Sequence, residues 1–80
     1  MIASISSLSG LVYIQLGQKR NICKTLDFDA QTIVEVDARG ELVAIEMIKP
    51  SQSILNRIAK KFQRADLARI NLDSLQKAIN

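Results

Sequence analysis

Four basic side chains in the C-terminal half have the type and spacing that could bind an anion. They fall at i, i+3, i+4 and i+7, so one face of a helix would present them together. They are Arg57, Lys60, Lys61 and Arg64. Such a face could contact phosphates or dock an acidic protein partner. A solvated helix face is the simpler interpretation of the same pattern, and the sequence favours it.

The charge of the chain is divided unevenly along its length. Residues 49–80 carry seven basic and two acidic side chains, for a net charge of +5. Residues 1–48 carry four basic and six acidic side chains, for a net charge of −2. The charge is therefore polarised along the chain.

Tyr13, Cys23 and the pair Asp27 and Asp29 are the other side chains that could do chemistry. Tyr13 is expected either to anchor an interface, where its hydroxyl can stay in contact with water at the rim, or to lie in the core with its hydroxyl hydrogen-bonded. Cys23 is the only cysteine, which excludes an internal disulfide, and we expect it to pack as a small strand residue. Two aspartates without the further spaced oxygen ligands of a calcium loop predict no metal site.

Histidine is absent from the sequence, and with it the commonest general base and the commonest metal ligand of proteins. The carboxylates are scattered, and no spacing places two of them beside a nucleophile. We therefore predict that the protein is not an enzyme, and we identify no catalytic, cofactor-binding or metal-binding residue and no cofactor.

Aromatic side chains are few: Tyr13, Phe28 and Phe62. A protein that binds single-stranded nucleic acid adds aromatic side chains on which the bases stack. The total charge of +3 is also small for a nucleic-acid binder. We therefore expect a second protein as the partner, bound through the helix surface or the C-terminal segment.

Residues 31–47 predict a β-hairpin around which the rest of the chain is arranged. Asp37-Ala38-Arg39-Gly40 has the pattern of a three-residue loop, in which Gly40 takes a positive φ. The predicted register pairs Val36 with Leu42, Val34 with Ala44 and Thr32 with Glu46 on one face, and Glu35 with Val43, Ile33 with Ile45 and Gln31 with Met47 on the other. Both faces would then be apolar, and since one helix covers only one face, the second face predicts a homodimer.

Two further strands are expected before the hairpin, at residues 11–16 and 22–28. Residues 1–9 would form a short edge strand or a loose lead-in. The first strand would have Val12, Ile14 and Leu16 on one face and Leu11, Tyr13 and Gln15 on the other. The second would place Ile22, Leu26 and Phe28 on its core side, with Lys24 interrupting that face. The predicted sheet is a four-stranded antiparallel meander over residues 11–48.

A helix is expected after Pro50, because proline cannot donate to an internal ladder and ends the sheet. Residues 51–64 have the period of an amphipathic helix, capped by Ser51 or Ser53. Its core stripe would consist of Ile54, Leu55, Ile58, Ala59, Phe62 and Ala65. A short last helix, capped by Asn71 or Asp73, would place Leu72, Leu75 and Ile79 on a second stripe.

The 80 residues are expected to form one domain, with the sheet at about 11–48 and the helical segment at about 51–80. The predicted class is α+β: a four-stranded antiparallel meander followed by one long and one short C-terminal helix. Neither a signal peptide nor a membrane span is expected, because the N-terminus has no basic region and no apolar run is long enough. A single cysteine suits a reducing cytoplasm.

The stretches LVYIQL (11–16) and TIVEVDARGELVAIEMI (32–48) resemble the YuzE-like family of small bacterial domains of unknown function. The match covers about residues 5–50 and includes Tyr13-Ile14, the Asp-x-x-Gly turn Asp37-Ala38-Arg39-Gly40, and Ala44-Ile45-Glu46-Met47. Ile5, Ser6 and Gly10 stand where the family usually has Tyr-Asp and a second Asp, so any role of those acids is lost or moved. The resemblance implies a small β-sheet domain with a following helix, no known catalytic activity and, in some members, an antitoxin-like partnership.

Together these patterns predict a non-catalytic protein-interaction module that is homodimeric, cytoplasmic and without a membrane partner. The residues expected at its interaction surface are Arg57, Lys60, Lys61, Arg64 and Tyr13. The alternative is an antitoxin-like or nucleic-acid-binding regulator that uses the basic helix at residues 57–64.

Overall fold

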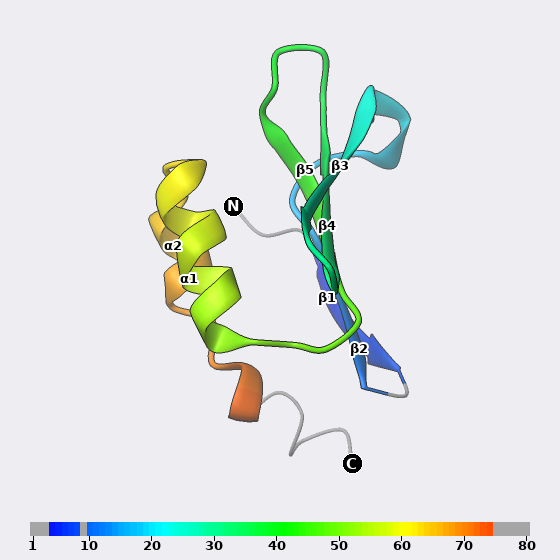
Figure 1. Cartoon of the computed structure of the whole chain (residues 1–80). Coiled ribbons are helices and arrows are strands. Elements are labelled where there is room, and N and C mark those ends of the chain that lie inside the picture. Colours follow the sequence, from blue (N-terminus) through cyan, green and yellow to red (C-terminus); the bar gives the residue numbers. More distant parts are fainter. Residues whose placement is uncertain (1–3, 9, 75–80) are drawn as a thin grey trace.

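The protein has two layers, a five-stranded antiparallel sheet and a layer formed by two short α-helices on one face of it (Figure 1). The computed structural model describes residues 4–8 and 10–74, without the side chain of Leu8. The strands are β1 (Ser4–Leu8), β2 (Leu11–Gln15), β3 (Lys24–Asp29), β4 (Thr32–Val36) and β5 (Leu42–Met47). The helices are the 3₁₀ helix η1 (Lys19–Asn21) and the α-helices α1 (Gln52–Lys61) and α2 (Ala65–Ala68), after which a helical turn begins at Leu72. The predicted α+β class is confirmed.

The strand order is β1-β2-β5-β4-β3, so the predicted four-stranded meander is wrong in two respects. Residues 4–8 add a fifth strand, and β2 pairs with β5 instead of β3. The apolarity of the strands explains the order, because β5 is buried at every residue but Glu46, whereas residues 24–27 of β3 are exposed. The most apolar strand takes the centre and a polar one takes an edge, where one side of the backbone remains open.

The hairpin between β4 and β5 closes as predicted. The amide of Asp37 donates to the Glu41 carbonyl at 2.9 Å, and the Asp37 carboxylate accepts from the amides of Arg39 and Glu41, both at 2.9 Å. Gly40 has a φ of 83°, the left-handed conformation that glycine adopts without strain. Val36 then lies opposite Leu42, as expected.

Beyond this first pair the predicted register is wrong by one residue. Glu35 lies opposite Ala44, not Val43, and Val34 lies opposite Ile45, not Ala44. A β-bulge causes the shift: Val43 is an extra residue on β5, so that two residues of one strand face one of the other. Every later side chain of β5 therefore points to the opposite face from the one predicted.

The shift separates apolar from polar side chains across the whole sheet. On the face that the helices cover, one row of opposed residues is Ile5, Ile14, Ile45, Val34 and Leu26. On the other, here called the open face, the corresponding rows are Ser4, Gln15, Ala44, Glu35 and Thr25, and Ser6, Tyr13, Glu46, Ile33 and Asp27. The prediction of two apolar faces is wrong, since the open face has the mixed character of a solvated antiparallel sheet. The homodimer stays a prediction, but a second apolar face no longer supports it.

The helix α1 begins where the sequence predicts and ends earlier. The Ser51 hydroxyl accepts from the amide of Ile54 at 3.3 Å and caps the first turn. At the other end Gln63 has a φ of 55°, and the amides of Arg64 and Gln63 donate to the carbonyls of Ala59 and Lys60. This is a Schellman motif, which ends the helix at Lys61 and not at Arg64.

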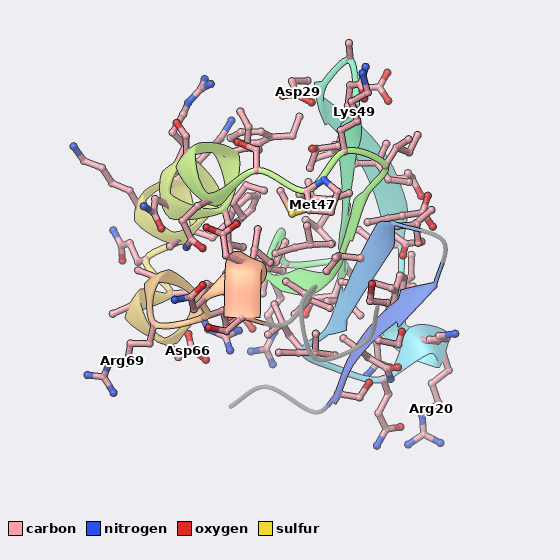
Figure 2. The ribbon with its side chains drawn as sticks, turned by 90° about the horizontal axis from the view of Figure 1, so that it is seen from below. Arg20, Asp29, Met47, Lys49, Asp66 and Arg69 are labelled. Carbon is pink, nitrogen blue, oxygen red and sulfur yellow. The ribbon has the colours of Figure 1, made fainter. Side chains whose placement is uncertain are left out.

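The core lies between the covered face and the helices. Leu55 and Ile58 are fully buried, as are Ile45 and Met47 of β5, and Figure 2 shows the Met47 side chain between the two layers. The partly buried Ile54 and Phe62 pack against this core as predicted, but Ala65 is exposed. Leu72 is buried, and Asn71 caps its turn by accepting from the Ser74 amide at 3.1 Å. The predicted stripe residues Leu75 and Ile79 lie outside the described residues.

The packing of α1 can be tested with two matched isoleucines. Ile58 is fully buried, whereas Ile48 is 58% exposed. Ile58→Ala should lower the free energy of unfolding by about 2–5 kcal/mol, because it removes buried methyl groups and leaves a cavity. Ile48→Ala should change it by less than about 1 kcal/mol. Urea denaturation followed by circular dichroism measures both, and equal midpoints would contradict this placement of α1.

The turn can be tested with two matched glycines. Gly40 has a positive φ, and a Cβ there would meet nothing within 4 Å, so the cost of Gly40→Ala is backbone strain alone. Gly17 lacks a positive φ, and a Cβ there would make an ordinary contact of 3.7 Å with Val43. We expect Gly40→Ala to be less stable than Gly17→Ala by about 1 kcal/mol. If Gly17→Ala were the less stable variant in thermal unfolding, the turn geometry would be wrong.

Candidate functional site

A basic groove lies between α1 and the edge strand β3. At its base is Phe28, whose ring is partly buried against the core. The guanidinium carbon of Arg57 lies 5.5 Å from the centroid of this ring, and Nζ of Lys61 lies 5.8 Å from it. Because Arg57 and Lys61 are one helical turn apart, both reach the same ring and make cation–π contacts with it.

The groove has a volume of about 390 Å³ and is lined by Asp27, Phe28, Arg57, Lys60 and Lys61. The three cations are exposed, and in residues 4–8 and 10–74 none of them forms an ion pair with a carboxylate. The side chain of Asp27 belongs to the open face of β3, where it lies opposite Ile33. The groove therefore offers positive charge above an apolar base, which suits an anion with an apolar neighbour.

The structure brings together three of the four cations expected on one helix face. Arg64 leaves the series because α1 ends at Lys61, and its guanidinium instead lies 2.9 Å from the carboxylate of Asp66. The hydrogen bond from Arg64 lowers the pKa of Asp66, and the charge of Arg64 acts in the same direction. Arg64 thus belongs to the connection between α1 and α2 and not to the groove.

Tyr13 is on the other side of the sheet from the groove. Its hydroxyl reaches across β5 and donates to Oε1 of Glu35 on β4 at 3.4 Å, which explains why Ala44, between them on the open face, is fully buried. Nζ of Lys19 lies 5.1 Å from the centroid of the Tyr13 ring. Of the two expectations for this residue, a core tyrosine is wrong, because the ring is half-buried on the open face.

Burial raises the pKa of the Tyr13 hydroxyl above its ordinary value. The negative charge of Glu35 and the hydrogen bond to it raise this pKa further, and the charge of Glu46 adds to the effect. These groups hold the phenol in its neutral form and let it donate to the carboxylate. Tyr13 therefore ties β2 to β4 over the central strand.

The sequence predicts that Phe28, which lies at the base of the groove, and Leu26, on the same strand, belong to the core. Leu26 and Phe28 alternate with polar residues along β3, which correctly predicts that they face the helices. Leu26 is nevertheless 39% exposed, because β3 is an edge strand. The position of β3 in the sheet was not available from the sequence, and the alternation alone could not show that this side of the strand lines a surface.

The remaining candidates give no site. Cys23 is exposed, so the expectation that it packs within a strand is wrong. Across the described part of the chain no three of the His, Cys, Asp and Glu residues gather as a metal ion would require. No helix in that part is long and apolar enough to cross a membrane.

Comparison with known proteins finds no match to any family model, to any curated protein or to any solved structure. Membership of the YuzE-like family therefore stays a prediction from the motifs.

The contact between Tyr13 and Glu35 can be tested by titration, because Tyr13 is the only tyrosine and the chain has no tryptophan. Tyrosinate absorbance should report a pKa above the ordinary value of about 10. Since the folded state holds the proton more tightly, the stability from this contact is complete below pH about 10 and is lost as the pH rises through the raised pKa.

Glu35→Gln should lower the pKa of Tyr13 because it removes the neighbouring charge. Glu41→Gln removes an exposed carboxylate at the far end of the hairpin and should leave that pKa unchanged. If both variants kept the wild-type pKa, burial and the charge of Glu46 would account for the shift, and Glu35 would have no electrostatic role.

Proposed function

We propose that the protein is a non-catalytic protein-interaction module that binds an acidic segment of a second protein in the α1–β3 groove, which is lined by Asp27, Phe28, Arg57, Lys60 and Lys61. The observation that carries the proposal is the placement of Arg57 and Lys61 over the Phe28 ring. Their contact with the ring holds two flexible cations at the groove, so less conformational entropy is lost when an anion binds.

The distribution of charge supports an acidic partner. The groove side of the molecule carries the unpaired cations of α1, whereas the open face carries the carboxylates of Glu35, Glu46 and Asp27. An acidic segment is attracted to the first side and repelled by the second. This arrangement selects one docking surface and one orientation of approach, which is the main effect of charge at interfaces.

An antitoxin-like or nucleic-acid-binding regulator is the second candidate, because the same three cations could contact phosphates. The groove is less suited to that function. Phe28 is partly buried and already has two cations over its ring, so it is not a platform on which a base can stack. A cytoplasmic location completes the proposal and rests on the single cysteine of the sequence.

The proposal can be tested with labelled poly-glutamate, with single-stranded DNA of mixed sequence, and with a triple variant that carries Arg57→Gln, Lys60→Gln and Lys61→Gln. At about 150 mM salt we expect poly-glutamate to bind the wild type and to bind the triple variant about tenfold more weakly, because exposed ion pairs contribute roughly 0.2–1 kcal/mol each. Fluorescence anisotropy measures both affinities.

A matched control removes three positive charges elsewhere, by Arg20→Gln, Arg39→Gln and Arg69→Gln. These side chains are exposed, and Figure 2 shows Arg20 and Arg69 pointing outward at separate ends of the molecule. The control should bind poly-glutamate like the wild type. If DNA bound more tightly than poly-glutamate, with a log–log salt slope of about −2 for three phosphates, and bound only when the groove cations were present, the regulator would replace the proposal.

A further inference from the structure

The edge strand β3 has backbone groups that no described strand uses. It is the last strand in the order β1-β2-β5-β4-β3, and within the described residues it pairs with β4 alone. In an antiparallel ladder only alternate backbone groups point to a given neighbour, so the rest of those in β3 face outward. The register of residues 24–27 with β4 is regular, and a bulge follows before Asp29. This regular stretch is spaced to receive one more short strand.

The free edge lies beside the α1–β3 groove. Leu26 lies opposite Val34, which places it on the face that α1 covers, and the alternation of the strand places Lys24 on the same face. Phe28 lies at the bulge and packs against the core on this face. Leu26 is 39% exposed and Lys24 is exposed. The apolar surface of Leu26 therefore continues the groove from the helix to the edge of the sheet.

A sixth strand on this edge would have two distinct sides. Every second side chain would lie next to Leu26 on the groove side, within the field of Arg57 and Lys61. The side chains between them would lie on the open face next to Thr25 and Asp27. Carboxylates and one apolar side chain suit the first side, and neutral side chains suit the second, because a carboxylate there would be repelled by Asp27.

From this juxtaposition we infer that the acidic partner binds as an extended segment that adds to β3 as a sixth strand, with acidic and apolar residues alternating with neutral ones. The inference rests on the proposed function and specifies the conformation and the residue pattern of the partner. Backbone hydrogen bonds along β3 contribute affinity, and the groove side selects the sequence, as in other cases of strand addition.

A second copy of the chain does not fit the same edge. Two β3 strands paired about a two-fold axis would bring Lys24, Arg57 and Lys61 of both copies onto one side of a continuous sheet, where like charges repel. The opposite edge, β1, carries no charged residue and gives an acidic segment no reason to bind there.

The experiment uses the labelled peptide Glu-Thr-Val-Thr-Glu, capped at both ends, and two N-methylated forms of it. One form is methylated at the two threonines, and the other at the valine and the second glutamate. Alternate amides of a bound strand face β3, so one form loses hydrogen bonds to β3 and the other does not. We expect one form to bind at least about tenfold more weakly than the other. Equal affinity of the two forms would overturn strand addition.

Two neighbouring residues of β3 give the matched protein variants, since both are exposed and lie on opposite faces. Leu26→Glu places a negative charge on the groove side, and Thr25→Glu places it on the open face. We expect Leu26→Glu to weaken binding of the peptide about tenfold and Thr25→Glu to change it less than about threefold. Thermal unfolding of both variants confirms that each is folded.

The outcomes separate this inference from the proposed function. Binding that needs the three groove cations, with equal affinity for the two N-methylated forms, would keep the acidic partner and reject its strand conformation. If the peptide and poly-glutamate bound the wild type and the triple Gln variant with equal affinity, both the proposed function and strand addition would be rejected. Weaker binding of one N-methylated peptide than of the other, together with weaker peptide binding by the Leu26→Glu variant, supports both the acidic partner and its strand conformation.

Discussion

Between Leu42 and Ala44 the central strand carries one residue more than its partner β4, and this bulge determines which side chains face the helices. With it, Ile45 and Met47 enter the core and are fully buried. Without it, the polar Glu46 would point at α1 and those two residues at solvent, because a shift of one residue exchanges the two faces of a strand. The burial of each of these side chains is worth about 1.5–3 kcal/mol, so the bulged register is strongly favoured over the regular one.

The same register creates the electrostatic difference between the two faces. It gathers Glu35 and Glu46 around Tyr13 on the open face, while the cations of α1 lie on the other side of the sheet. The result is a molecule with carboxylates around Tyr13 on the open face and exposed cations at the α1–β3 groove. For the proposed acidic partner, this asymmetry would supply orientation and selectivity more than affinity, and the proposed strand addition at β3 would supply directional contacts beside the basic groove.

The Schellman motif at the end of α1 sets the size of that groove. By ending the helix at Lys61 it turns Arg64 toward Asp66 and leaves Arg57, Lys60 and Lys61 beside β3. Phe28 links the two elements, because its ring packs on the core and makes cation–π contacts with Arg57 and Lys61 above it. The groove is thus preorganised by contacts that also contribute to the fold, which ties its geometry to the stability of the α1–sheet interface.

Local patterns in the sequence determined the elements whose cause is local. Asp37 and Gly40 predict the hairpin loop, since both act on the backbone within a few residues, and Ser51 predicts the start of α1 for the same reason. The period of Leu55 and Ile58 predicts the buried face of that helix.

Only the tertiary structure decided the strand order, the bulge at Val43 and the exposure of Leu26, because each depends on how strands far apart in the sequence compete for the centre of one sheet. The sequence therefore predicts one side of the groove, because helical spacing brings its cations together. The other side could not be predicted, because the strand order of the sheet decides that β3 is an edge strand beside α1.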